Sequence, residues 1–116
     1  MRVDRDEICE RLGGDEELLC ELAGVFIDSG TQLLGRLSEA MKSLDFANLG
    51  RAAHSLKGSA SVFNLTEIVD ATTELEQTAK GCEAERASVL VCRIKQQIQE
   101  VVPIFASFAG KASCES

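Results

Sequence analysis

Apolar residues recur every three or four positions along most of the chain, and polar residues fill the positions between them. The longest such run begins after Asp15 and continues to Leu44. Its apolar members are Leu18, Leu19, Leu22, Val25, Phe26, Leu33, Leu34, Leu37, Ala40, Met41 and Leu44. This spacing places one apolar stripe along an α-helix, so we predict a single long amphipathic helix here.

A second periodic stretch follows a short turn. Asp45 can cap a helix that ends near Asn64, a residue type that tolerates the left-handed conformation of helix ends. The apolar seam of this helix steps by three and four residues through Phe46, Leu49, Ala53, Leu56, Ala60 and Phe63. We expect Thr66 to cap the next helix, which stops at Gly81, so that the two helices form a hairpin.

The two ends of the chain carry the remaining periodic segments. A short helix is predicted over residues 4–12, with Asp4 as its N-cap and a pair of glycines after it. The last helix starts at Glu83, and we expect Pro103 to kink it or end it within one turn. Its apolar members are Ala87, Leu90, Val91, Ile94, Ile98, Val101 and Val102.

These segments predict an all-α fold. Four long amphipathic helices joined by short turns close an antiparallel four-helix bundle, with the short N-terminal helix added to it. A length of 116 residues suits one core, and a single proline leaves long stretches free to be helical. We therefore expect one domain over residues 1–110 and a flexible tail over residues 111–116.

The charge of the chain bears on its partners. A formal net charge of -7 and a pI near 4.7 argue against binding to nucleic acid, which needs a basic face. We see no apolar run long enough to span a bilayer and no signal peptide at the N-terminus. The expected location is the cytoplasm, with no attachment to a membrane.

Five cysteines are scattered at wide intervals, at positions 9, 20, 82, 92 and 114. They form no CxxC pair, so neither a metal site nor a disulfide framework is expected. Cys20 and Cys92 fall within apolar helical patterns. We expect these two to pack in the core as small hydrophobic residues in a reducing compartment.

The single histidine lies on a second face of the Asp45–Asn64 helix. Gly50, His54, Lys57, Gly58 and Ser61 share one spacing of three and four residues, beside the apolar seam. His54 is therefore expected to point away from the core. Each glycine costs a helix interior up to about 1 kcal/mol relative to alanine, and without Cβ atoms there the imidazole is open to another protein.

The charges around His54 differ from those of the whole chain. No acidic residue occurs between Asp45 and Glu67, whereas Arg51 and Lys57 are both basic. Such a patch suits an acidic or phosphorylated partner. The alternative is that His54 is an ordinary surface residue and the glycines serve helix packing. A catalytic site that needs two histidines, such as a paired Glu-x-x-His di-iron centre, is excluded.

Residues 53–60, A-H-S-L-K-G-S-A, resemble the HxxKG signature of histidine-containing phosphotransfer (HPt) domains. The resemblance implies a helical bundle in which His54 is phosphorylated, Lys57 is the charge partner of the phosphoryl group and Gly58 lets a receiver domain dock. The pair Leu75-Glu76 is similar to the family's pair on the next helix, which implies that Glu76 orients the imidazole. A surface ion pair between Glu76 and Lys80 is the alternative.

The same resemblance implies a function. The protein would relay a phosphoryl group between receiver-domain aspartates of hybrid sensor kinases and response regulators, as a monomer and not as an autonomous kinase or phosphatase. Docking would use the exposed stripe together with Val62 and Leu65. The chain itself would bind no cofactor, because the Mg²⁺ would be held by the receiver. A helical docking module that carries no phosphate is the alternative function.

Overall fold

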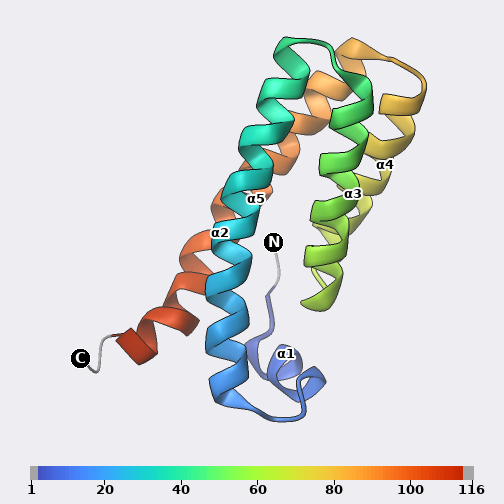
Figure 1. Ribbon diagram of the computed structural model, residues 1–116. Helices are drawn as coiled ribbons and strands as arrows, with labels where there is room; N and C mark the ends of the chain where they lie inside the picture. Colours follow the sequence, from blue (N-terminus) through green and yellow to red (C-terminus); the bar gives the residue numbers. More distant parts are fainter. Residues whose placement is uncertain (1–2, 114–116) are drawn as a thin grey trace.

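The computed structural model describes the backbone of residues 3–113 and the side chains of residues 3–108. The described residues form five helices and no strand (Figure 1). In chain order they are α1 Arg5–Arg11, α2 Glu16–Lys42, α3 Phe46–Val62, α4 Thr66–Lys80 and α5 Ala84–Ser113.

The four long helices form one bundle. Each of them contacts two neighbours: α2 packs on α3 and α5, and α4 packs on α3 and α5. Short turns connect successive helices, so they run antiparallel to one another (Figure 1). The short helix α1 contacts the start of α2 and lies below the end of α3 in Figure 1. The predicted all-α bundle with an additional N-terminal helix is confirmed.

Aspartates begin three of the five helices. Asp4, Asp15 and Asp45 each accept a hydrogen bond on the side chain from the backbone N–H three residues further on, at 3.1, 3.0 and 3.1 Å. A cap of this kind contributes about 1 kcal/mol to helix stability. The N-caps predicted at Asp4 and Asp45 are therefore confirmed, and Asp15 caps the long helix α2.

The cap predicted at Thr66 was wrong. Thr66 is the first residue of α4, and Leu65 occupies the cap position without a side-chain hydrogen bond. Asn64 has a φ of 55°, the left-handed conformation that we predicted for it. This conformation turns the chain so that Leu65 enters the core, where it is 2% exposed. The burial of Leu65 therefore stabilises this turn, and no side-chain cap such as the one predicted at Thr66 is present.

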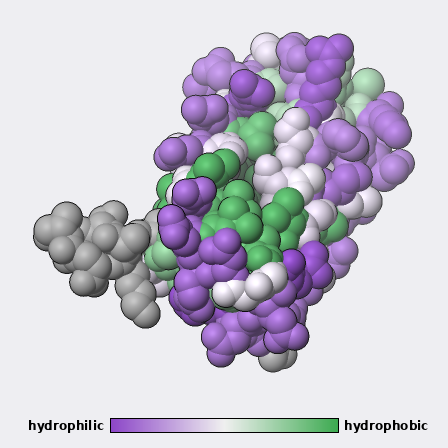
Figure 2. All heavy atoms as spheres, turned by 60° about the horizontal axis from the view of Figure 1, so that its bottom comes forward, coloured by the Kyte–Doolittle hydropathy of each residue, from purple (hydrophilic) through white to green (hydrophobic). Residues whose placement is uncertain are grey.

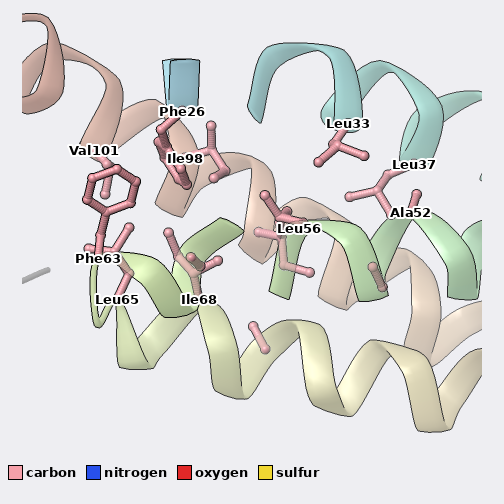
Figure 3. Packing of buried hydrophobic residues seen from close by; sticks show 14 of the residues in the cluster. Phe26, Leu33, Leu37, Ala52, Leu56, Phe63, Leu65, Ile68, Ile98 and Val101 are labelled. Atoms are coloured by element: carbon pink, nitrogen blue, oxygen red, sulfur yellow. The ribbon is translucent and has the colours of Figure 1, made fainter. Parts of the chain in front are cut away.

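The core runs along the centre of the bundle (Figure 3). Five of the six residues in the predicted α3 seam are buried, and Phe46 is half-buried. At one end Phe26, Phe63 and Phe105 pack together, with ring centroids 4.8 to 5.3 Å apart. Aromatic pairs at these separations contribute about 0.5 to 1.5 kcal/mol beyond the area they bury. The aromatic cluster joins α2 and α5 to the turn that follows α3.

Helix α5 does not end at Pro103. It continues to Ser113 with Pro103 inside it. The proline ring is exposed, while Val101 and Phe105 on either side of it are fully buried on one face. Their burial outweighs the one backbone hydrogen bond that proline cannot donate. Of the two outcomes predicted for Pro103, an end of the helix within one turn was therefore wrong, and a kink stays a prediction.

The flexible tail expected over residues 111–116 stays a prediction. Residues 111–113 continue α5, so the helix extends beyond the expected boundary at residue 110. Residues 114–116, which include Cys114, lie outside the described residues.

The cysteines do not all pack as expected. Cys92 is exposed on α5, and Cys20 is half-buried, with its thiol donating to the carbonyl of Phe108 at 3.1 Å. Cys9 on α1 is the buried one, at 6% exposure. Cys92 lies next to the buried Val91, one position off the core-facing stripe of α5. A difference of one residue rotates a helical side chain by about 100°, which separates the two.

Helix α2 has a composition that we did not expect. By length and composition alone, it passes the test for a membrane-spanning helix. The expectation that no segment is long and apolar enough therefore fails by this criterion. The same test is passed by core helices of soluble proteins. In the bundle, Leu19, Phe26 and Leu37 of α2 are buried against the other helices, but only 28% of its apolar window is buried.

Replacing Pro103 with alanine is expected to stabilise the protein by about 1 to 3 kcal/mol. Alanine restores the hydrogen bond to the carbonyl of Gln99 and loses no packing, because the ring is exposed; the larger entropy of the unfolded variant reduces the gain. Urea unfolding of both proteins measures the difference. The control is Gln96→Ala on the exposed face of α5, expected to change stability by less than about 0.5 kcal/mol. Equal stability of Pro103→Ala and the wild type would contradict a continuous α5.

Candidate functional site

His54 lies on α3 and points away from the core, as predicted. Its side chain is 71% exposed, whereas the neighbouring Ala53 is fully buried. The apolar seam faces α2, α4 and α5 and leaves this stripe of α3 at the surface. The imidazole is therefore open to solvent and to another protein.

Glu76 on α4 connects His54 with Lys57. One carboxylate oxygen, Oε2, lies 3.1 Å from His54 Nδ1, and the other, Oε1, lies 2.6 Å from Lys57 Nζ. An ionised carboxylate can only accept hydrogen bonds, so the proton of the neutral ring belongs on Nδ1. The lone pair of a neutral imidazole is then on Nε2, the nitrogen that Glu76 does not contact.

The environment of Glu76 determines its ionisation. Its side chain is 17% exposed, and burial alone raises the pKa of a carboxyl group. The hydrogen bonds from Lys57 and His54, together with their charges, outweigh burial and lower the pKa of Glu76 below its usual value. Glu76 is therefore ionised at neutral pH and holds both partners beside α4.

The alternative pairing of Glu76 with Lys80 is not the one observed. Both oxygens of the carboxylate are directed at α3 residues, and within the described part of the chain no ion pair joins Glu76 to Lys80. Lys57 is 30% exposed and is held beside the imidazole by the same carboxylate. The structure thus brings His54, Lys57 and Glu76 together in one cluster, as the sequence predicted.

The two glycines of the stripe have different surroundings. A Cβ atom at Gly58 would meet nothing within 4 Å, so the surface there is open. A Cβ atom at Gly50 would lie 3.7 Å from the Cβ of Ala79 on α4, an ordinary contact. Gly58 therefore faces solvent, and Gly50 faces the neighbouring helix.

The other residues predicted to contact a partner also differ from one another. Ser61 is exposed and its hydroxyl donates to the carbonyl of Lys57 at 2.8 Å, and Val62 is 45% exposed. Leu65 was a wrong prediction, because it is 2% exposed and belongs to the core. Val25 on α2 is 58% exposed and was not singled out. The sequence did hold a signal for this exposure, because α2 has more apolar positions than one buried stripe needs.

Two grooves flank the histidine stripe, and Arg51 and Ser55 line both. The groove between α2 and α3 has a volume of about 840 Å³, and its lining residues include Arg36, Glu39 and Asn48. The groove between α3 and α4 has a volume of about 660 Å³ and contains His54 itself. The sequence indicated neither groove, because each depends on how two helices are spaced.

Comparison with known families identifies the bundle. The model of the Hpt domain matches residues 21–102. The chain belongs to the Hpt domain family. The matched range contains the four-helix core up to Pro103 and all three residues of the cluster at His54, and it excludes α1. No solved structure gives a significant match.

One relative of known name is the phosphorelay intermediate protein rdeA of Dictyostelium discoideum. It is 24% identical to this chain over 107 residues, which are 92% of the chain and 42% of the relative. The chain thus spans less than half the length of that protein. The likeness extends beyond the family match at the ends of the chain.

The tie between α3 and α4 predicts a pH dependence of stability. The pKa of Glu76 is lower in the folded than in the unfolded state, so its contribution is present above the usual carboxyl pKa and is lost as pH falls through the folded value. The stability difference between the wild type and Glu76→Gln is therefore expected to shrink as pH falls below the usual carboxyl pKa. Urea unfolding at a series of pH values measures this difference.

The control for this experiment is Glu21→Gln. Glu21 is an exposed carboxylate on α2, with no ion-pair partner among the described residues. Its substitution is expected to change stability by a small amount that varies little over the same pH range. A difference for Glu76→Gln that stays constant as pH falls would contradict the ionic tie.

Proposed function

We propose that this protein is a histidine phosphotransfer protein, which relays a phosphoryl group between receiver-domain aspartates through His54. The observation that carries the proposal is the contact of 3.1 Å between His54 Nδ1 and Glu76, together with the 71% exposure of the His54 side chain. It fixes the proton on one ring nitrogen and leaves the other as a nucleophile that a large partner can reach.

The reaction is a reversible displacement at phosphorus. The lone pair of Nε2 attacks the phosphorus of a receiver's aspartyl phosphate in line with the leaving oxygen. The N–P bond forms as the P–O bond to the aspartate breaks, and the aspartate leaves as a carboxylate. The proton on Nδ1 stays in its hydrogen bond with Glu76. The reverse step, with a second receiver, passes the group on.

Lys57 and Glu76 support this step in different ways. The ammonium of Lys57, one turn from the ring, is the charge partner of the phosphoryl oxygens. Glu76 is a positioning residue, because it acts on the ring and not on the phosphoryl group. As the ring becomes cationic on phosphorylation, the carboxylate also stabilises its positive charge.

The partners in this proposal are receiver domains of hybrid sensor kinases and of response regulators. Docking uses the open surface at Gly58, Ser61 and Val62, and it requires only a monomer. The Mg²⁺ that the transfer needs is held by the receiver, and this chain supplies no cofactor. The protein is a relay and neither an autonomous kinase nor a phosphatase, and its place is the cytoplasm, without nucleic acid or membrane.

Phosphotransfer from a panel of phosphorylated receiver domains tests the proposal. The wild type is expected to acquire a label within about a minute, stable to alkali and labile to acid, and His54→Gln to acquire none, because the amide is no nucleophile. Ser59→Ala, which removes a hydroxyl of α3 that lines neither groove, is the matched control and is expected to take the label like the wild type. Gel electrophoresis of quenched samples gives the rates.

Two outcomes would contradict the relay. Label on His54→Gln would place the phosphoryl group elsewhere. Receiver binding that His54→Gln leaves unchanged, without label on any variant, would indicate a docking module.

Substitutions of Glu76 test its positioning role. Glu76→Ala is expected to lower the transfer rate by about ten- to a hundredfold, the range found for outer residues that orient an imidazole. Glu76→Gln keeps an oxygen that accepts from Nδ1 and is expected to retain most of the rate. If both variants bind the receiver with the wild-type affinity, the lower rate comes from the orientation of the ring and not from weaker docking. Equal losses in the two variants would contradict the role of the hydrogen bond.

A further inference from the structure

The groove between α3 and α4 begins at His54 and extends toward the start of α3. Its α3 wall runs from Phe46 to Ser55, so most of it precedes the histidine, and its α4 wall includes Glu76. Most of the lining side chains are small or apolar. The lining consists of Phe46, Ala47, Gly50, Arg51, His54, Ser55, Glu76, Ala79, Lys80 and Cys82.

This groove lies within reach of any protein that exchanges a phosphoryl group with His54. A specific interface buries about 800 Å² on each partner, a patch with a radius of about 16 Å. Helical rise places Gly50 about 6 Å and Phe46 about 12 Å along the axis from His54. A receiver centred on the imidazole therefore covers the groove as well as the Gly58 side. This step rests on the function proposed above.

The chemistry of the groove selects what can enter it. Gly50 and Ala79 form a floor with almost no side chain, and Phe46 and Ala47 add apolar walls. Two cations, Arg51 and Lys80, stand among the lining residues, and in the described part of the chain neither forms an ion pair with a carboxylate. By contrast, most residues that line the α2–α3 groove are of polar types, and they include the acidic Glu39 and Asp45.

We propose that the α3–α4 groove is a specificity pocket for the receiver domain, which inserts an apolar side chain next to a carboxylate. The apolar side chain fills the space over Gly50 and Ala79. The neighbouring carboxylate meets Lys80 or Arg51 at the edge of the groove, where the charges are complementary. An anchored apolar side chain surrounded by charged contacts is the usual source of affinity and selectivity in protein interfaces.

The cysteines of the chain allow a direct test by footprinting. Cys82 is exposed and lines the groove, whereas Cys92 is exposed on α5 and does not. The wild-type chain is treated with N-ethylmaleimide, alone and with the receiver that transfers fastest in the panel. With receiver at about ten times its Kd, alkylation of Cys82 is expected to slow by about tenfold, and that of Cys92 to stay unchanged. Peptide mass spectrometry resolves the two sites.

The outcomes separate the pocket from the relay. Transfer to His54 with Cys82 alkylated at its free rate, while fluorescence anisotropy shows the receiver bound, would overturn the pocket and leave the relay intact. If no receiver in the panel transfers a phosphoryl group or binds, the result would contradict the proposed function itself. It would then also contradict a receiver as the occupant of the groove.

A pair of charge reversals tests the carboxylate. Lys80→Glu and Lys95→Glu change the net charge equally, but Lys95 is exposed on α5 outside the groove. Lys80→Glu is expected to raise the Kd for the receiver by about tenfold, and Lys95→Glu by less than about threefold. Equal effects of the two variants would mean that only the overall charge matters and would overturn the local contact.

Discussion

The carboxylate of Glu76 is the interaction on which the site depends. It lies between an imidazole, at 3.1 Å, and an ammonium, at 2.6 Å, that both come from a different helix. The geometry holds only if α3 and α4 keep a fixed spacing and register. The packing of the bundle therefore determines the chemistry at His54, although the imidazole itself contacts mostly solvent.

Small residues make this spacing possible. Ala53, Ala60 and Ala71 are buried where α3 and α4 meet their neighbours, and Gly50 faces Ala79 across the pair. Short side chains let two helices approach closely, so a carboxylate of ordinary length on one helix reaches the ring on the other. The same small residues leave the groove beside His54 empty, so one packing choice serves both the orientation of the ring and the shape of the surface.

Much of the fold could be predicted from the sequence, because helical periodicity and capping are local. The caps at Asp4 and Asp45 depend on residues three positions apart, and the seam of α3 on steps of three and four. The helix end at Pro103 and the cap at Thr66 were misjudged for a common reason. A neighbouring side chain, Phe105 in one case and Leu65 in the other, is buried against distant parts of the chain, and its burial decided the local conformation. The exposure of Cys92 shows that helical periodicity predicts which positions are buried only to within one residue.

The site divides in the same way. The cluster of His54, Lys57 and Glu76 could be predicted from a short motif and a matching pair on the next helix. The burial of Leu65, the exposure of Val25 and the different surroundings of Gly50 and Gly58 could not, since each depends on which helix lies alongside.

The helices of the bundle differ in length, and this gives α1 a structural task. At 1.5 Å per residue, α2 and α5 are about 40 and 45 Å long, whereas α3 and α4 reach only about 25 and 22 Å. The shorter hairpin thus leaves a step at the aromatic end of the core. Helix α1 lies at this step. Its Ile8 and Cys9 are buried, its Glu7 accepts from Asn64 in the turn after α3, and its Arg11 donates to the carbonyl of Ser61 at the end of α3. From outside the range that the family model matches, α1 thus covers part of this end of the core, although apolar side chains still reach the surface on the face seen in Figure 2.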